Sequence, residues 1–144
     1  MQPSKSASEG LSLWIPHGMI GFPGLTRYRL VRPSEGNPFS LLVSEEKPQI
    51  RFSLMDPLLI RPDYQPRISA GALEELELRE AGETYVVVNT PDDARGMTAN
   101  MRAPFLVNEQ SGIGAQILLE DEDLPVRALL VEEWEREQVE LLTV

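Results

Sequence analysis

The sequence contains no cysteine among its 144 residues, which excludes disulfide bonds, thiol nucleophiles and cysteine-ligated metal sites. Its single histidine, His17, stands between a proline and a glycine, as is typical of a turn. A Ser–His–Asp triad would have to use His17, and a surface histidine is the better interpretation. Aromatic residues make up 6% of the chain, which is little for the aromatic walls of a ligand pocket. We therefore expect no enzyme and no cofactor.

Long hydrophobic runs are also missing. No stretch approaches the roughly 18 apolar residues of a membrane-spanning helix, and the first ten residues lack the apolar centre of a signal peptide. We therefore expect a cytoplasmic protein without a membrane partner. With 144 residues, 42% of them hydrophobic, the chain can form one domain with a real core. We expect a disordered arm over residues 1–10, one domain over 11–127 and an acidic extension over 128–144.

Positive charge is scarce, since 13 Lys and Arg stand against 23 Asp and Glu, for a net charge of -10. This balance disfavours direct binding of nucleic acid, and it favours a monomer. From Leu118 onward, two basic residues face nine acidic ones. Such a segment would attract a basic partner and repel a polyanion. A solubilising acidic segment is the alternative, and the composition leaves both open.

Twelve prolines are scattered along the chain and interrupt most helical patterns. Short β-prone runs lie between turn residues, a pattern typical of an all-β sandwich or barrel. The turn sequence of residues 33–38 predicts a hairpin between the third and fourth runs. The runs are Leu11–Ile15, Met19–Phe22, Tyr28–Val31, Phe39–Val43, Ile50–Met55, Tyr85–Asn89, Pro104–Val107 and Gln116–Leu119.

Two stretches depart from the β pattern. Residues 69–79 predict a short internal helix at one end of the barrel, with Ser69 as its N-cap. Residues 125–142 predict an amphipathic helix, since apolar side chains recur there at helical spacing. Asp123 would cap this helix and Pro125 would lie near its start. Alternatively, Pro125 belongs to a last strand that precedes a shorter helix, and the sequence does not decide between the two.

The remaining polar clusters predict structure rather than chemistry. The acidic pairs and runs at Asp92-Asp93 and at residues 120–123 lack the ligand spacing of a calcium loop. Asp56, before Pro57, is placed to accept hydrogen bonds from backbone amides in a turn. Asn100 is placed to satisfy backbone groups in a loop at the barrel end. Both segments predict a scaffold with a protein-facing surface.

Taken together, short motifs along residues 19–127 resemble the FliW family of flagellar assembly factors. No one of the motifs is decisive by itself, but their order and rough spacing match the family. The two ends of the chain depart from the family pattern. The matching motifs are Gly21-Phe22-Pro23-Gly24, Asn37-Pro38-Phe39, Asp56-Pro57, Pro62-Asp63-Tyr64, residues 86–91, Met97-Thr98-Ala99-Asn100, Ala103-Pro104, Val107-Asn108 and residues 116–119.

The resemblance implies a mainly β fold, a partly open antiparallel β-barrel that is not an enzyme. It also implies two alternating partners: flagellin, bound through its C-terminal region in a chaperone-like manner, and the RNA-binding translational regulator CsrA. Free FliW would hold CsrA away from flagellin messenger RNA, and accumulated flagellin would capture FliW and release CsrA. The alternative is a generic β-barrel that binds a small ligand and has no flagellar role; an enzyme ranks behind both.

We expect partner contacts in three parts of the chain. The 97–100 loop and the 56–64 turn carry polar residues ordered by nearby prolines, and the acidic end carries charge that suits a basic regulator. In the acidic end, Trp134 either anchors a partner or packs the terminal helix onto the barrel. The candidate protein-binding residues are Asp56, Asp63, Tyr64, Met97, Thr98, Asn100, Glu120, Asp121, Leu130 and Trp134.

Overall fold

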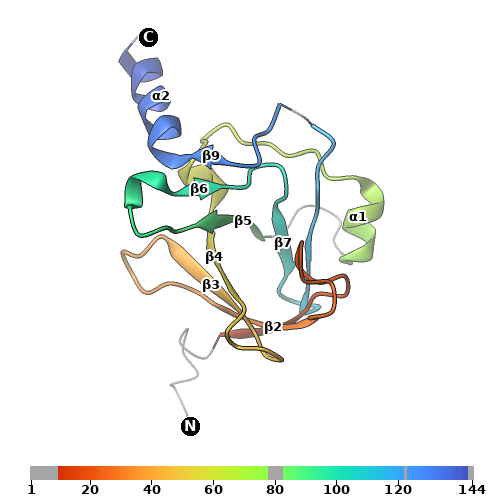
Figure 1. Cartoon of the computed structure of the whole chain (residues 1–144). Helices are drawn as coiled ribbons and strands as arrows, with labels where there is room; N and C mark the ends of the chain where they lie inside the picture. The colour runs from red at the N-terminus through yellow and green to blue at the C-terminus, as the bar shows by residue number, and fades with distance from the viewer. Residues whose placement is uncertain (1–9, 78–82, 122, 143–144) are drawn as a thin grey trace.

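A computed structural model describes residues 10–77, 83–121 and 123–142, and its strands wrap into a barrel (Figure 1). The strands of the barrel wall are β1 (Leu11–Trp14), β2 (Arg27–Val31), β3 (Phe39–Ser44), β4 (Arg51–Met55), β5 (Glu83–Asn89), β7 (Phe105–Asn108) and β8 (Ile113–Gln116). They are hydrogen-bonded in the order β4-β3-β2-β1-β8-β7-β5, and β4 pairs with β5 to close the ring.

The ring is antiparallel apart from one seam. At that seam β1 runs parallel to β8 through a single residue pair, Trp14 with Ile113. The hairpin predicted around residues 33–38 joins β2 to β3, with the Asn37 amide donating to the Ser34 carbonyl at 3.0 Å. The predicted fold class, a mainly β barrel with a short internal helix and a helix at its C-terminal end, is confirmed. The barrel is closed by the β4–β5 pairing, however, whereas a partly open barrel was predicted.

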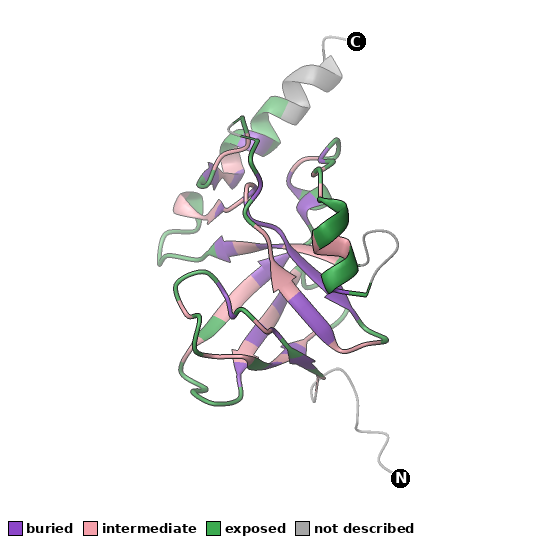
Figure 2. Ribbon diagram, turned by 90° about the vertical axis from the view of Figure 1, so that its right-hand side faces the viewer, coloured by how far each residue is buried: buried purple, intermediate pink, exposed green. Residues whose placement is uncertain are grey.

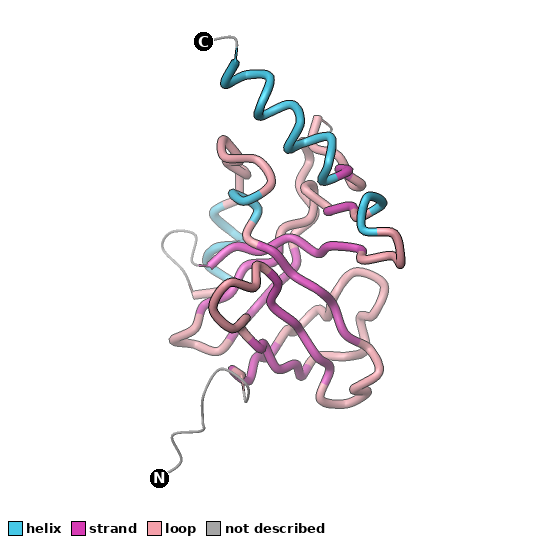
Figure 3. The backbone as a smooth tube through the Cα atoms, turned by 90° about the vertical axis from the view of Figure 1, so that its left-hand side faces the viewer, coloured by secondary structure: helices cyan, strands magenta, loops and turns pink. Residues whose placement is uncertain are grey.

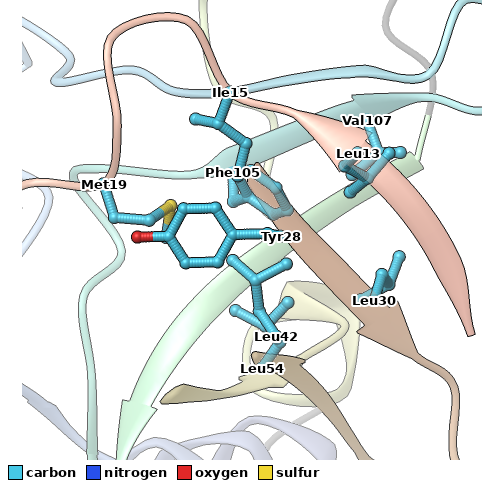
Figure 4. Close-up of a cluster of buried hydrophobic side chains, with 9 residues drawn as sticks. All are labelled: Leu13, Ile15, Met19, Tyr28, Leu30, Leu42, Leu54, Phe105 and Val107. Atoms are coloured by element: carbon cyan, nitrogen blue, oxygen red, sulfur yellow. The ribbon is translucent and has the colours of Figure 1, made fainter. Parts of the chain in front are cut away.

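The barrel interior is filled by side chains that alternate along each strand. In β3 every second residue is buried, because successive side chains of a strand point to opposite faces. Purple and pink segments alternate along the strands in Figure 2 for the same reason. The main core cluster is apolar except for one hydroxyl group (Figure 4). It consists of Leu13, Ile15, Met19, Tyr28, Leu30, Leu42, Leu54, Phe105 and Val107.

The strand predicted over Met19–Phe22 is wrong, because this segment is a tight turn. The Phe22 amide donates to the Met19 carbonyl at 2.8 Å, and the two residues form only an isolated bridge. Gly21 has a φ of 94°, a left-handed value that ends any extended strand. Met19 is nevertheless 1% exposed. The apolar residues that suggested a strand are therefore explained by a side chain that packs into the core from a turn.

The last predicted strand of the barrel is displaced. It was predicted over Gln116–Leu119, whereas β8 ends at Gln116 after pairing its Ile113–Gln116 span with β7. Beyond Gln116 the chain still donates hydrogen bonds toward the 102–104 segment, from Ile117 to Pro104 and from Leu119 to Arg102. The pattern of apolar residues therefore predicted that this segment pairs with the strand before it, but placed the start and the end of the strand about three residues too late.

The internal helix α1 (Ala70–Glu75) begins as predicted at Ser69, whose side chain accepts a hydrogen bond from the Ala72 amide. The helix is shorter than predicted, since Leu76 is its C-cap, and the predicted end at Arg79 lies outside the described residues. Leu76 is buried against Leu106 and Ile113, so this end of α1 covers the barrel wall.

The C-terminal end contains a strand followed by a helix. Strand β6 (Thr98–Ala99) pairs with β5 and also with β9 (Ala128–Leu129), and α2 (Leu130–Leu142) follows directly. A last strand does precede a shorter helix, as the alternative predicted, but this strand begins at Ala128 and does not include Pro125. The helix start predicted near Pro125 is wrong. Asp123 does not cap α2, because it lies seven positions before Leu130. In Figure 3, α2 projects away from the barrel. The predicted arm over residues 1–10 lies, except for Gly10, outside the described residues.

Candidate protein-binding surface

A short 3-10 helix, η1 (Pro57–Leu59), follows β4 and forms one side of the candidate surface. Asp56 is its N-cap, with a carboxylate oxygen accepting a hydrogen bond from the Leu58 amide at 2.9 Å. This is the structural role that the sequence predicted for Asp56. The tight turn leaves the side chains of Leu58 and Leu59 half exposed, at 50% and 52%.

Helix α2 is held by an ion pair to Arg61, two residues after η1. The Arg61 guanidinium donates from Nε to Glu133 Oε1 at 2.6 Å and from a terminal nitrogen to Oε2 at 3.1 Å. Arg136 donates a further bond to Glu133 at 3.2 Å. The Glu133 side chain is 6% exposed, so this carboxylate is enclosed by its two cationic partners. The hydrogen bond to Glu133 raises the pKa of Arg61, which therefore stays charged at all physiological pH values.

Two further contacts place α2 on the barrel. The Trp134 indole nitrogen donates to the Leu59 carbonyl at 3.0 Å, while 37% of the residue stays exposed. Leu130 is fully buried in a second core cluster, which contains Met55, Ile60 and also residues of β5 and β6. Trp134 thus contributes to packing and also presents surface, whereas the buried side chain of Leu130 holds the helix in place.

The 97–100 segment is part of the barrel framework. Thr98 and Ala99 pair with β9, and the Leu130 amide donates to the Met97 carbonyl at 3.1 Å. The side-chain oxygen of Asn100 accepts from the Arg102 amide at 3.1 Å, as the sequence predicted for a loop-satisfying asparagine. Met97, Thr98 and Asn100 are half-buried, so they support the C-terminal elements more than they form an open surface.

Tyr64 likewise has a structural position. It is 7% exposed, and its hydroxyl donates to the Met101 carbonyl at 2.7 Å. Burial raises the pKa of this phenol to about 12, so it remains a neutral donor. Tyr64, Met97 and Leu130 meet in or against the second core cluster, although they are far apart in the sequence.

Glu120 and Asp121 belong to a different part of the molecule. Both are exposed, and they line a cleft of about 710 Å³ whose other wall is formed by residues 67–69, ahead of α1. A carboxylate oxygen of Asp121 accepts from the Asp123 amide at 2.9 Å. The exposed residues among those predicted therefore divide between two surfaces.

We call the first of these the η1–α2 surface. Its apolar members are the exposed side chains of η1 and the tryptophan of α2, and exposed carboxylates lie on α2 and on the residues that flank η1. This combination fits a protein partner that carries positive charge around an apolar contact. The surface consists of Asp56, Leu58, Leu59, Asp63, Glu132, Trp134 and Glu135.

Sequence reasoning missed the residues that assemble this surface. In an amphipathic helix, acidic side chains are expected to face solvent, but Glu133 lies three residues after the buried Leu130 and therefore on the same helix face. No sequence motif distinguished Arg61, Leu58 or Leu59, which lie between the aspartates of the 56–64 turn. The i,i+3 spacing from Leu130 was the signal that could have identified Glu133.

The single histidine and the described acidic residues are the candidate metal ligands or catalytic groups. His17 is exposed and forms a 2.7 Å ion pair with Glu75, in agreement with its interpretation as a surface histidine. Within residues 10–77, 83–121 and 123–142, no three His, Asp or Glu side chains gather so as to hold a metal ion. No described helix combines the length and the apolar character needed to cross a membrane.

Comparison with known proteins identifies the family. The family model described as "FliW protein" matches residues 5–130 of this chain. The chain belongs to the FliW family. Its relatives include the flagellar assembly factor FliW of Thermotoga sp. (strain RQ2), 38% identical over 122 residues, which cover 83% of this chain and 82% of the relative. The FliW of Leptospira biflexa serovar Patoc is 32% identical over 126 residues, which cover 85% and 82% of the two chains.

A solved structure supports the same assignment. The crystal structure of a flagellar assembly factor FliW superposes with a TM-score of 0.76 at 25% sequence identity, covering 83% of this chain and 84% of that one. The predicted resemblance to the FliW family is therefore confirmed, and the relatives are named as assembly factors, not as enzymes.

Proposed function

We propose that this FliW-family protein acts in flagellar assembly by binding two proteins in alternation, flagellin and the translational regulator CsrA. Flagellin would be held through its C-terminal region, in a chaperone-like manner. CsrA would be held away from flagellin messenger RNA for as long as flagellin is scarce. Family membership supports the flagellar role, since the relatives named above are flagellar assembly factors.

The η1–α2 surface is our candidate contact for CsrA. A protein that binds RNA phosphates carries basic residues, and the η1–α2 surface offers carboxylates around exposed apolar side chains. Leu58, Leu59 and Trp134 would supply the apolar contact, because exposed Leu and Trp side chains gain most from removal of water. This placement of three exposed large apolar side chains among acids is the observation that carries the proposal.

The negative charge of the chain explains how the complex would oppose RNA binding by the regulator. With two basic and nine acidic residues from Leu118 onward, the docked protein lowers the electrostatic potential around the regulator. Bringing RNA phosphates to the same complex then costs more free energy. The same carboxylates would therefore attract the regulator and disfavour its RNA, without covering the RNA-binding edge itself.

A paired substitution tests the surface. The variant combines Leu58→Ser and Leu59→Ser. Because both leucines are about half exposed, the fold should tolerate the change. We expect the affinity for CsrA, measured by calorimetry, to fall by about tenfold or more. The control is Ile20→Ser, which removes an apolar side chain that is 53% exposed in a different turn, and it should bind like the wild type. Equal affinities for all three proteins would refute the η1–α2 surface as the contact.

A further inference from the structure

The chain beyond β8 has an open backbone edge. Residues 117 and 119 continue the antiparallel register of β8 against β7, because their amides donate to the carbonyls of Pro104 and Arg102, at 2.9 and 2.8 Å. In such a ladder, the residue between two bonded positions points its own N–H and C=O to the other side. That residue is Leu118, and its backbone N–H has no hydrogen-bond partner among the described residues.

This open edge faces a cleft of the size that takes a ligand. The cleft has a volume of about 710 Å³, which falls in the usual range of roughly 300–1,000 Å³ for binding pockets. Its walls are the 117–121 segment and the 67–69 segment that leads into α1. The Leu118 side chain is 64% exposed, the largest exposed fraction among the exposed large hydrophobic residues.

The charged residues around the cleft favour a positively charged ligand. Glu120, Asp121 and Asp123 line it, and Arg67 is the one basic residue among the described residues that do so. Half-buried Ile68 and Ile117 add apolar contact area between these charges. A ligand that fits all three features has backbone groups to pair with Leu118, positive side chains for the carboxylates and an apolar side chain for the isoleucines.

We propose that this cleft binds an extended basic segment of a partner protein, which adds a strand beside Leu118. Unpaired strand edges are recurrent docking sites for extended peptides, in which backbone hydrogen bonds give affinity and alternate side chains give specificity. At about 3.3 Å per residue, three or four residues of such a segment span the edge from residue 117 to residue 120. The proposal goes beyond the function proposed above, because it concerns a second surface and holds whichever protein supplies the segment.

A synthetic peptide provides the test on the full-length protein. The probe is a six-residue peptide that alternates lysine and valine, added to isotope-labelled protein and followed by NMR. We expect binding with a dissociation constant at or below about 1 mM. We also expect hydrogen exchange of the Leu118 amide to slow by about tenfold or more at saturation, since that amide gains an acceptor. No binding at several times this concentration, or unchanged exchange at Leu118, would overturn the proposal.

Two controls separate strand addition from simple charge attraction. The same peptide with all its backbone amides N-methylated keeps its lysines but cannot donate to a strand edge, so its affinity should be at least about tenfold lower. Glu120→Gln should weaken binding of the parent peptide about two- to fivefold, as for an exposed ion pair. Glu35→Gln, at an exposed residue of the hairpin between β2 and β3, is the matched control and should leave the affinity unchanged. Equal binding of the methylated and parent peptides would contradict the strand pairing. Because the probe is neither flagellin nor CsrA, its result is independent of the test of the η1–α2 surface.

Discussion

Tyr28 is the one polar side chain in the main core cluster. It is fully buried, and its hydroxyl points toward Met19 in Figure 4, with no hydrogen-bond partner among the described residues. Burial, and secondarily the charge of Glu46, raises the pKa of this phenol, so it is neutral at physiological pH. An unsatisfied buried hydroxyl costs free energy that a phenylalanine would not.

Tyr28→Phe should therefore leave the free energy of unfolding unchanged or raise it by about 1 kcal/mol. Tyr64→Phe is the matched control, because it removes the same atom from a hydroxyl that donates to the Met101 carbonyl at 2.7 Å. That variant should lose about 1–2 kcal/mol, since the carbonyl is left without its donor. Urea denaturation of the three proteins measures both values. A clear loss of stability in Tyr28→Phe would show that its hydroxyl is satisfied in solution.

At the scale of single elements, α2 depends on contacts with residues outside the helix. Arg61 holds Glu133 from the turn after η1, the Leu59 carbonyl accepts from Trp134, and Leu130 enters the second core cluster. The helix carries several further carboxylates and receives only Arg136 as a cation of its own among residues 130–136. Its position on the barrel is therefore set by the Arg61–Glu133 pair and by burial, rather than by contacts within the helix.

Glu133→Gln should lower the free energy of unfolding by about 3 kcal/mol and increase hydrogen exchange along α2, because the Arg61 charge loses its partner at a partly buried site. Glu132→Gln, one position earlier, is the control and should change stability by less than about 0.5 kcal/mol, since Glu132 is exposed. If the two variants have the same stability, the Arg61–Glu133 pair does not hold the helix.

Local patterns predicted those elements whose cause is local. The strands β2 to β4 follow from alternation and a turn sequence, and Ser69 marks the start of α1 because its side chain caps the helix. The Met19–Phe22 turn was mistaken for a strand because Met19 is buried for tertiary reasons. Strand β6 is two residues long and depends on β9, 30 residues later in the chain, so no short pattern reveals it.

In the candidate site, too, local contacts could be predicted from the sequence and long-range contacts could not. Asp56 and Asn100 were correctly expected to satisfy backbone groups, because their partners are two residues away. The Arg61–Glu133 pair joins residues 72 positions apart, and the separation of Glu120 and Asp121 from α2 depends on the path of the chain through the barrel. Such contacts become visible only when the sheet is assembled.

At the scale of the whole molecule, charge sets the conditions for binding. The net charge of -10 is concentrated toward the C-terminal end, on the segments that line the cleft and form α2. An electrostatically driven complex with a basic regulator should weaken by about tenfold or more when ionic strength rises from about 0.05 M to about 0.5 M, because exposed charges are then screened. Calorimetry at the two salt concentrations measures this; an affinity independent of salt would contradict a charge-driven complex.

The most direct test of the proposed function is competition between its two partners. The full-length protein would be titrated with CsrA and with flagellin from the same organism, separately and then together, by calorimetry. We predict binding of each partner alone and release of CsrA when flagellin is added to the preformed complex. Binding of neither protein, or binding of both at once without displacement, would contradict the alternating partnership.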